Sequence, residues 1–170
     1  MGQYLYGVAL IFFLLVCYVV FHETQLYQEH YLKAKYVVEE VATAGAQYNY
    51  LSDYADGYYN FYQDEGEKAI HHFIRSNFNL DNDLMPLEAG KGYWHEQMKY
   101  EATFIDYQSP QYTAFPGTYS YTHFGKLHEI TLNGPSVIVT LDVGRAPLRI
   151  SRLFKDDSTN YVTAIHTFED

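Results

Sequence analysis

Hydrophobic positions fill the first stretch of the chain without a charge among them. From Leu5 to Phe21 the sequence reads LYGVALIFFLLVCYVVF, and the first Asp, Glu, Lys or Arg is Glu23. A helix that crosses the core of a bilayer needs about 20 mostly apolar residues. Aromatic rings that favour the membrane interface lie near both ends of the stretch, at Tyr4, Tyr6 and Tyr18. Residues 1–21 are therefore predicted to form a transmembrane helix.

Two other interpretations of this stretch fit the sequence less well. A cleaved signal peptide would carry a positive n-region, a shorter apolar run and a small-x-small cleavage site. The N-terminal flank has no Lys or Arg, and His22-Glu23-Thr24 offers no such site. A buried core helix is the weaker alternative. The charge rule for orientation has only Lys33 and Lys35 to count and is nearly silent. We expect a single-pass protein with its N-terminus in the cytoplasm, where a three-residue tail holds no function, and with an extracytoplasmic domain.

The pattern changes after Phe21 from a continuous apolar run to a helical period. Residues 22–50 contain no proline, and Gly45 is their only glycine. Apolar residues recur here at steps of three and four. The stripe consists of Tyr27, Tyr31, Ala34, Val38, Val41, Gly45 and Tyr48, widened by Val37 and Ala42, with Glu29, Lys33, Glu39 and Glu40 off it. Residues 22–50 are therefore predicted to continue the first helix as an amphipathic half.

A second, shorter helix is predicted after a region of turn residues. Asp56-Gly57 and Asp64-Glu65-Gly66 each predict a turn, so the chain from residue 51 should form a loop or short hairpin. Asp64 followed by Glu67 matches a capping box at the start of a helix that runs to about Asn77. The expected buried face consists of Ala69, Ile70, Phe73 and Ile74.

Alternation of apolar and polar residues replaces the helical period after Pro86. It first occurs in the segment 98–104, where Met98, Tyr100, Ala102 and Phe104 alternate with Lys99, Glu101 and Thr103. After a proline-containing break at 109–117, the segments 128–132, 136–143 and 161–168 share the same period. Asn133-Gly134-Pro135 predicts a tight turn between the first two of these. The predicted fold class is α+β: a long N-terminal helix, a short second helix and a C-terminal antiparallel β-sheet, with residues 51–170 as one globular domain.

Charge narrows the range of partners. The formal net charge is −10, and every charged side chain follows the apolar stretch. Binding to nucleic acid or to anionic lipid rests on clustered Lys and Arg, which this acidic chain lacks. We therefore expect no nucleic-acid partner. The single cysteine, Cys17, lies in the predicted span, so an intrachain disulfide framework is excluded.

Candidate metal ligands are present but poorly spaced. His71 and His72 are adjacent on the second predicted helix, near Glu65 and Glu67, and adjacent helical side chains point about 100° apart. The i and i+4 histidine pair of HExxH does not occur. The segment 80–84 resembles the start of a calcium loop, but it lacks the glycine and glutamate of an EF-hand. Solvated turn chemistry explains that segment better, and only Asp81 and Asp83 stay as candidates. We predict no metal and no cofactor.

The common catalytic motifs are also missing from the sequence. GxSxG, Walker A and GxGxxG patterns do not occur, and the only thiol lies in the predicted span. Glu101 and Asp106 would form a carboxylate pair only if the fold brought them together. We therefore expect that the protein is not an enzyme.

Tyrosine is the residue type whose abundance stands out. The chain has 19 tyrosines, and many are clustered. Tyrosine provides a large contact area with a hydroxyl that tolerates a wet rim, which suits protein interfaces, and its ring also stacks on sugars. The alternative, that tyrosines only fill a helix-on-sheet core, remains open for any single residue. The predicted surface or interface set is Tyr54, Tyr58, Tyr59 and Tyr62.

The order of elements resembles the type IV pilin plan, and more narrowly that of Tad-type (TadE-like) pseudopilins. The resemblance rests on the unbroken apolar-to-amphipathic helix with its Ala-rich segment VVEEVATAGA at 37–46. It implies that the helix packs in a filament core with copies of itself or with other pilins, and that the sheet faces outward. The assembly helix would use Leu5, Val8, Leu10, Ile11, Phe12, Leu14, Leu15, Val19, Val20, Val38, Val41 and Ala42.

One position departs from that plan. Cleavage after Gly2 would place Gly7 at the fifth mature position, where such pilins carry a glutamate. Two hypotheses follow from different classes of protein. The first is a structural subunit of a pilus-like filament or of a pilus or secretion assembly. The second is a single-pass membrane-anchored ectodomain that binds cell-wall glycan or a partner protein through its tyrosines.

Overall fold

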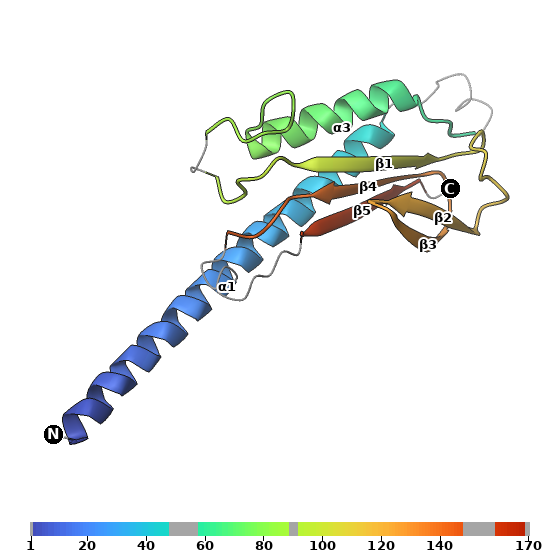
Figure 1. Cartoon of the computed structure of the whole chain (residues 1–170). Coiled ribbons are helices and arrows are strands. Elements are labelled where there is room, and N and C mark those ends of the chain that lie inside the picture. Colours follow the sequence, from blue (N-terminus) through green and yellow to red (C-terminus); the bar gives the residue numbers. More distant parts are fainter. Residues whose placement is uncertain (1, 48–57, 89–91, 148–158, 169–170) are drawn as a thin grey trace.

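The computed structural model describes residues 2–47, 58–88, 92–147 and 159–168. It confirms the predicted α+β class: a long helix, a shorter helix and antiparallel strands follow one another in that order (Figure 1). The elements are α1 (Gly2–Ala46), α3 (Gln63–Phe78), β1 (Lys99–Ile105), β2 (Gly117–His123), β3 (Lys126–Leu132), β4 (Ser136–Asp142) and β5 (Tyr161–Thr167).

Helix α1 is one unbroken helix of 45 residues, about 70 Å long at 1.5 Å per residue. Its N-terminal half projects away from the rest of the molecule, and its C-terminal half lies along the sheet (Figure 1). The prediction that the apolar helix continues beyond Phe21 is therefore confirmed. The helix ends at Ala46, and Tyr48 of the predicted stripe lies outside the described residues.

The C-terminal half of α1 buries the stripe that the sequence indicates. Ala34, Val38, Val41 and Ala42 have no exposed surface. Tyr31 and Tyr27, one and two turns before Ala34, are partly buried against the same core. The charged positions off the stripe, Glu29, Lys33, Glu39 and Glu40, are exposed.

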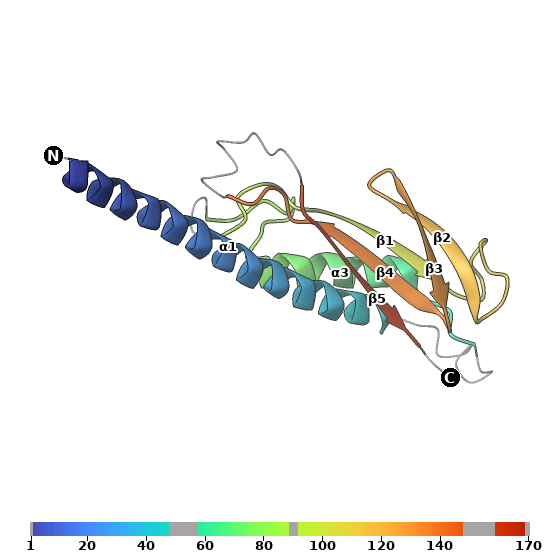
Figure 2. The same cartoon turned by 90° about the horizontal axis from the view of Figure 1, so that it is seen from below.

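The domain has three layers. Strand β4 lies between β1 and β5 in an antiparallel sheet, and α1 and α3 cover one face of this sheet. The β2–β3 hairpin covers the other face, as Figure 2 shows from below. Both faces of β4 are therefore buried: Val137, Val139 and Leu141 contact the helices, and Ile138 contacts the hairpin.

The turn predicted at Asn133-Gly134-Pro135 is present. This turn joins β3 to β4, but these strands belong to different sheets and do not pair. A Cβ atom on Gly134 would collide with the carbonyl oxygen of Phe168, so the close approach of the chain after β5 needs glycine at this position. Strand β2, the true partner of β3, begins where the sequence predicts only the end of a break. Buried Tyr119 and Tyr121 alternate there with exposed polar residues, so the two-residue period of a strand is present in this segment too.

The start of α3 also differs from the prediction. The helix begins at Gln63, so Asp64-Glu65-Gly66 form its first turn rather than a preceding loop. Tyr62 is the N-cap and no side chain caps the helix, so the predicted capping box is wrong. The buried face is Gly66, Ile70 and Ile74, whereas Phe73 is 41% exposed. The predicted turn Asp56-Gly57 lies outside the described residues.

Candidate functional site

The largest exposed apolar surface belongs to the N-terminal half of α1. The helix is long and apolar enough to cross a membrane, and its most hydrophobic window is not buried at all by the chain itself. A core helix of a soluble domain would be covered, so that alternative does not apply. The predicted assembly residues in this half are 40–71% exposed: Leu5, Val8, Leu10, Ile11, Phe12, Leu14, Leu15, Val19 and Val20.

The remaining three predicted assembly residues lie elsewhere. Val38, Val41 and Ala42 are fully buried in the chain's own core, so they offer no surface to a neighbouring helix. The same half of α1 instead exposes Leu32 (51%) and Tyr36 (64%) on its outer side. The helical period shows which face of a helix is buried, but not whether its own domain or a neighbouring molecule buries it. The position of the sheet in the fold decides this for α1.

The predicted tyrosine set divides into exposed and stacked residues. Tyr58 and Tyr62 are 52% and 42% exposed. Tyr59 is partly buried and its ring stacks on Phe168, with ring centroids 4.9 Å apart. Tyr54 lies outside the described residues.

Tyr58 is the outermost ring of an aromatic cluster that the sequence did not predict as one site. Its ring meets Tyr107 edge to face at 5.1 Å, and Tyr107 in turn contacts Tyr112 and Phe115 at 5.3 and 5.5 Å. We call Tyr58, Tyr107, Tyr112 and Phe115 the distal aromatic cluster. Figure 1 shows that the connection between β1 and β2, which carries three of them, lies at the end of the domain far from the N-terminus.

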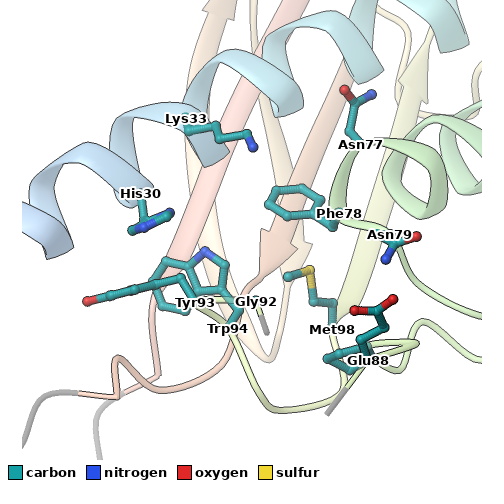
Figure 3. A pocket seen from close by; sticks show the side chains of 11 residues that line it. His30, Lys33, Asn77, Phe78, Asn79, Glu88, Gly92, Tyr93, Trp94 and Met98 are labelled. Carbon is teal, nitrogen blue, oxygen red and sulfur yellow. The ribbon is translucent and has the colours of Figure 1, made fainter. Parts of the chain in front are cut away.

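A cavity of about 330 Å³ lies between the two helices and the segment before β1 (Figure 3). His30 of α1 stacks on Tyr93 with ring centroids 4.2 Å apart, and Trp94 meets Tyr93 edge to face. Lys33 and Glu88 supply opposite charges at its rim. The Tyr93 hydroxyl points away from the other lining residues, out of this cavity (Figure 3).

Tyr93 also lines a second cavity, of about 420 Å³, which we call the boundary cavity. Its α1 wall consists of Tyr18, Val19, His22, Glu23 and Leu26, and Tyr93 and Pro147 close it from the domain. Two polar atoms of these lining residues are buried and have no hydrogen-bond partner among the described residues: Oε2 of Glu23 and the hydroxyl oxygen of Tyr93. Burial, together with the nearby Tyr27 and Glu23, raises the pKa of Tyr93 to about 12, so the hydroxyl keeps its proton at neutral pH.

In the segment that resembles a calcium loop, the carboxylate of Asp81 accepts hydrogen bonds from the backbone. Oδ1 of Asp81 accepts hydrogen bonds from the backbone N–H groups of Asp83 and Met85, at 2.8 and 2.9 Å. His71 is half-buried with Nε2 3.0 Å from the Asn82 carbonyl oxygen, and His72 is exposed. Among the described residues, no three His, Cys, Asp or Glu side chains are grouped to hold a metal ion.

Glu101 and Asp106 have separate structural roles. Oε2 of Glu101 accepts a hydrogen bond from the backbone N–H of Phe124 at the tip of the hairpin. Asp106 is 3% exposed and accepts hydrogen bonds from the backbone N–H of Phe61 and the hydroxyl of Ser109. Neither contact places the two carboxylates on a common substrate. These hydrogen bonds therefore do not bring Glu101 and Asp106 together as the carboxylate pair that the sequence left open.

The arrangement provides an apolar helix surface, a distal aromatic cluster and two cavities that share Tyr93. No protein-family model, curated protein or solved structure matches the chain. The sequence did not point to either cavity, because Tyr93 meets His30 and Glu23 only through the fold.

Proposed function

We propose that the protein is a membrane-anchored structural subunit of a pilus-like filament or of a pilus or secretion assembly. The observation that carries this proposal is the division of α1 into two halves within one unbroken helix. The first half is exposed and apolar, and the second half is the spine of the folded domain. Copies of the same chain, or other pilin-like proteins, are the proposed partners.

The continuity of α1 favours assembly over simple tethering. A tethered domain needs only a flexible linker between span and domain. Here the helix enters the core without a break, so the orientation of the domain is fixed relative to the apolar half. A regular assembly requires such a fixed orientation, because each copy must repeat the same contacts.

The exposed apolar half requires a non-aqueous environment. Full burial of a Leu, Ile, Val or Phe side chain is worth about 1.5–3 kcal/mol, and eleven such side chains are exposed along residues 5–20. Lipid or the helices of neighbouring copies would cover them. Because Gly7 stands where pilins carry glutamate, apolar packing rather than an ion pair at that position would hold the helices together.

Electron microscopy of sheared surface material, with identification of the chain in it, tests the proposal. We expect filaments that contain the chain, and we expect Leu10→Lys and Leu14→Lys to abolish them, since a charge at the centre of a span costs about 2.5–3.5 kcal/mol. Gln28→Lys, on the exposed side of α1 beyond the span, is the matched control. Assembly that survives both leucine changes would contradict the proposal.

A second candidate function is glycan or partner-protein binding by the domain, and the distal aromatic cluster favours it. Rings that present a face to solvent stack on sugars, and Tyr58 is the most exposed ring of the cluster. The test is cosedimentation of the protein with purified cell-wall polysaccharide. Binding that is lost in Tyr58→Ala but kept in Tyr36→Ala, another exposed tyrosine, would favour this function.

A further inference from the structure

The boundary cavity lies where the apolar half of α1 ends. Tyr18 and Val19 belong to the uncharged stretch, whereas His22 and Glu23 are the first polar residues after it. If the apolar half is inserted in a bilayer, one turn beyond Phe21 is at the depth of the lipid headgroups. The cavity therefore opens between the hydrocarbon region and water, beneath the edge of the domain.

Among the described residues, the wall of the cavity has one carboxylate, Glu23, and no Lys or Arg side chain. Within the part of the chain that the structure describes, Oε2 of Glu23 is a buried acceptor without a partner, and the buried Tyr93 hydroxyl does not bond to it. An unpaired buried carboxylate oxygen is costly, and a charged donor compensates it best. Both residues line the cavity, so a cationic donor bound in it would lie beside the Glu23 carboxylate.

Aromatic rings form much of the remaining wall. Tyr18 and His22 lie one turn apart on α1 with ring centroids 6.2 Å apart, and Tyr93 faces them from the domain. Ring faces attract cations within about 6 Å of their centroids, most strongly when water is excluded. A carboxylate among aromatic rings is suited to a small organic ammonium group.

We propose that the boundary cavity binds the primary ammonium group of an aminophospholipid with an ethanolamine headgroup, through Glu23 as the acceptor and with Tyr93 as its second polar contact. Headgroups are the ligands present at this depth, and ethanolamine carries N–H donors that choline lacks. Glu23 and the net charge of −10 disfavour anionic lipids. This inference rests on the membrane insertion of α1 in the proposed function.

The full chain, reconstituted in nanodiscs of equal phosphatidylethanolamine and phosphatidylcholine, provides the test. Native mass spectrometry of the released protein measures which lipid stays bound. We expect about tenfold enrichment of phosphatidylethanolamine, from one charge-assisted hydrogen bond. Glu23→Gln, which keeps the shape of the side chain, should remove the enrichment, and Tyr93→Phe should weaken it. Glu29→Gln, an exposed carboxylate on the same helix, should leave it unchanged.

Three results would overturn the inference. The first is an equal ratio of the two lipids on the wild-type protein, and the second is full enrichment in Glu23→Gln. The third is Glu23-dependent association of two chains in nanodiscs without phosphatidylethanolamine, which would assign the carboxylate to an amine of another copy. A chain that fails to enter nanodiscs would overturn the proposed membrane anchoring itself, whereas a chain that enters without enrichment would overturn only the lipid site. Equal melting midpoints would verify that all variants fold.

Discussion

Gly66 of α3 faces the carbonyl oxygen of Gly45 on α1 so closely that a Cβ atom on Gly66 would lie 2.9 Å from that oxygen. The same Cβ would lie 2.8 Å from the ring of Phe104 on β1. A Cβ on Gly45 would press against Ile70, whose flexible end lies 2.8 Å away. The two glycines therefore allow α3 to approach both the spine helix and the sheet.

We expect Gly66→Ala to lower the free energy of unfolding of the domain. The added methyl would meet backbone and ring atoms that cannot move aside, and such overpacking costs about 1–3 kcal/mol, although alanine gains up to about 1 kcal/mol in helix propensity. Thermal melting of the full chain in detergent measures the net effect. Gly7→Ala, which meets nothing within 4 Å, is the control. A melting midpoint for Gly66→Ala at or above that of Gly7→Ala would contradict the close packing.

The buried face of α3 can be tested with a pair of variants. Ile70 is fully buried, so Ile70→Ala should cost about 2–5 kcal/mol through lost contacts and a cavity. Phe73 is 41% exposed, so Phe73→Ala should cost less than about 1 kcal/mol despite the larger side chain. Denaturant unfolding gives both values. A larger loss of stability in Phe73→Ala than in Ile70→Ala would mean that α3 is rotated from its observed position.

Periodicity predicted the elements better than their pairing. The stripe on α1 repeats over several turns, so residue types alone located its buried face. The order of strands in the sheets depends on contacts between segments distant in the chain, and turn residues do not specify it. Asn133-Gly134-Pro135 has the composition of a hairpin turn, yet β3 pairs with β2 and β4 pairs with β1 and β5.

The candidate sites were predictable only where one segment forms them. The exposed apolar half of α1 is a single stretch of sequence, so its composition is enough to predict it. The boundary cavity needs Tyr93 to meet Glu23, and the distal aromatic cluster needs Tyr58 to meet Tyr107. No local sequence pattern indicates such contacts between residues far apart in the chain. A sequence also cannot show that Oε2 of Glu23 lacks a partner, since this depends on everything packed around it.

Asp106 should be a structural carboxylate rather than a catalytic one. Its two oxygens accept hydrogen bonds from the N–H groups of Phe61 and Gln108 and from the Ser109 hydroxyl, at 2.8–3.0 Å. Asp106→Asn places an amide N–H₂ against one of these donors, and an unsatisfied buried donor costs about 1–3 kcal/mol. Denaturant unfolding measures the loss. Asp83→Asn, at an exposed loop position, is the control and should change stability by less than about 0.5 kcal/mol.

His123, which is itself buried, connects the hairpin to the sheet through a chain of hydrogen bonds. Its Nε2 lies 2.8 Å from Oγ1 of Thr103 on β1, and its Nδ1 lies 2.7 Å from Oγ1 of Thr140 on β4. The Thr140 hydroxyl in turn lies 2.9 Å from that of Thr163 on β5. Burial lowers the pKa of His123 below its usual value, with Glu101 opposing the shift and His128 adding to it.

This lowered pKa makes the domain less stable in mild acid. Below a pH of about 6.5 the unfolded chain takes up a proton on this histidine while the folded chain does not. The stabilisation is therefore complete above that pH and is lost progressively as the pH falls toward the folded-state pKa. Burial also lowers the pKa of His166, which adds to the same trend.

Denaturant midpoints of the full chain at pH 7.5 and 5 measure this loss of stability. We expect the difference between the two midpoints to shrink in His123→Gln, which retains hydrogen-bonding groups for the two threonines but does not titrate. It should shrink further when His166→Gln is added, because both groups then no longer take up protons on unfolding. His72→Gln, at an exposed position of α3, should retain the wild-type difference. An unchanged difference in the double variant would show that other groups, not these two histidines, govern stability in this pH range.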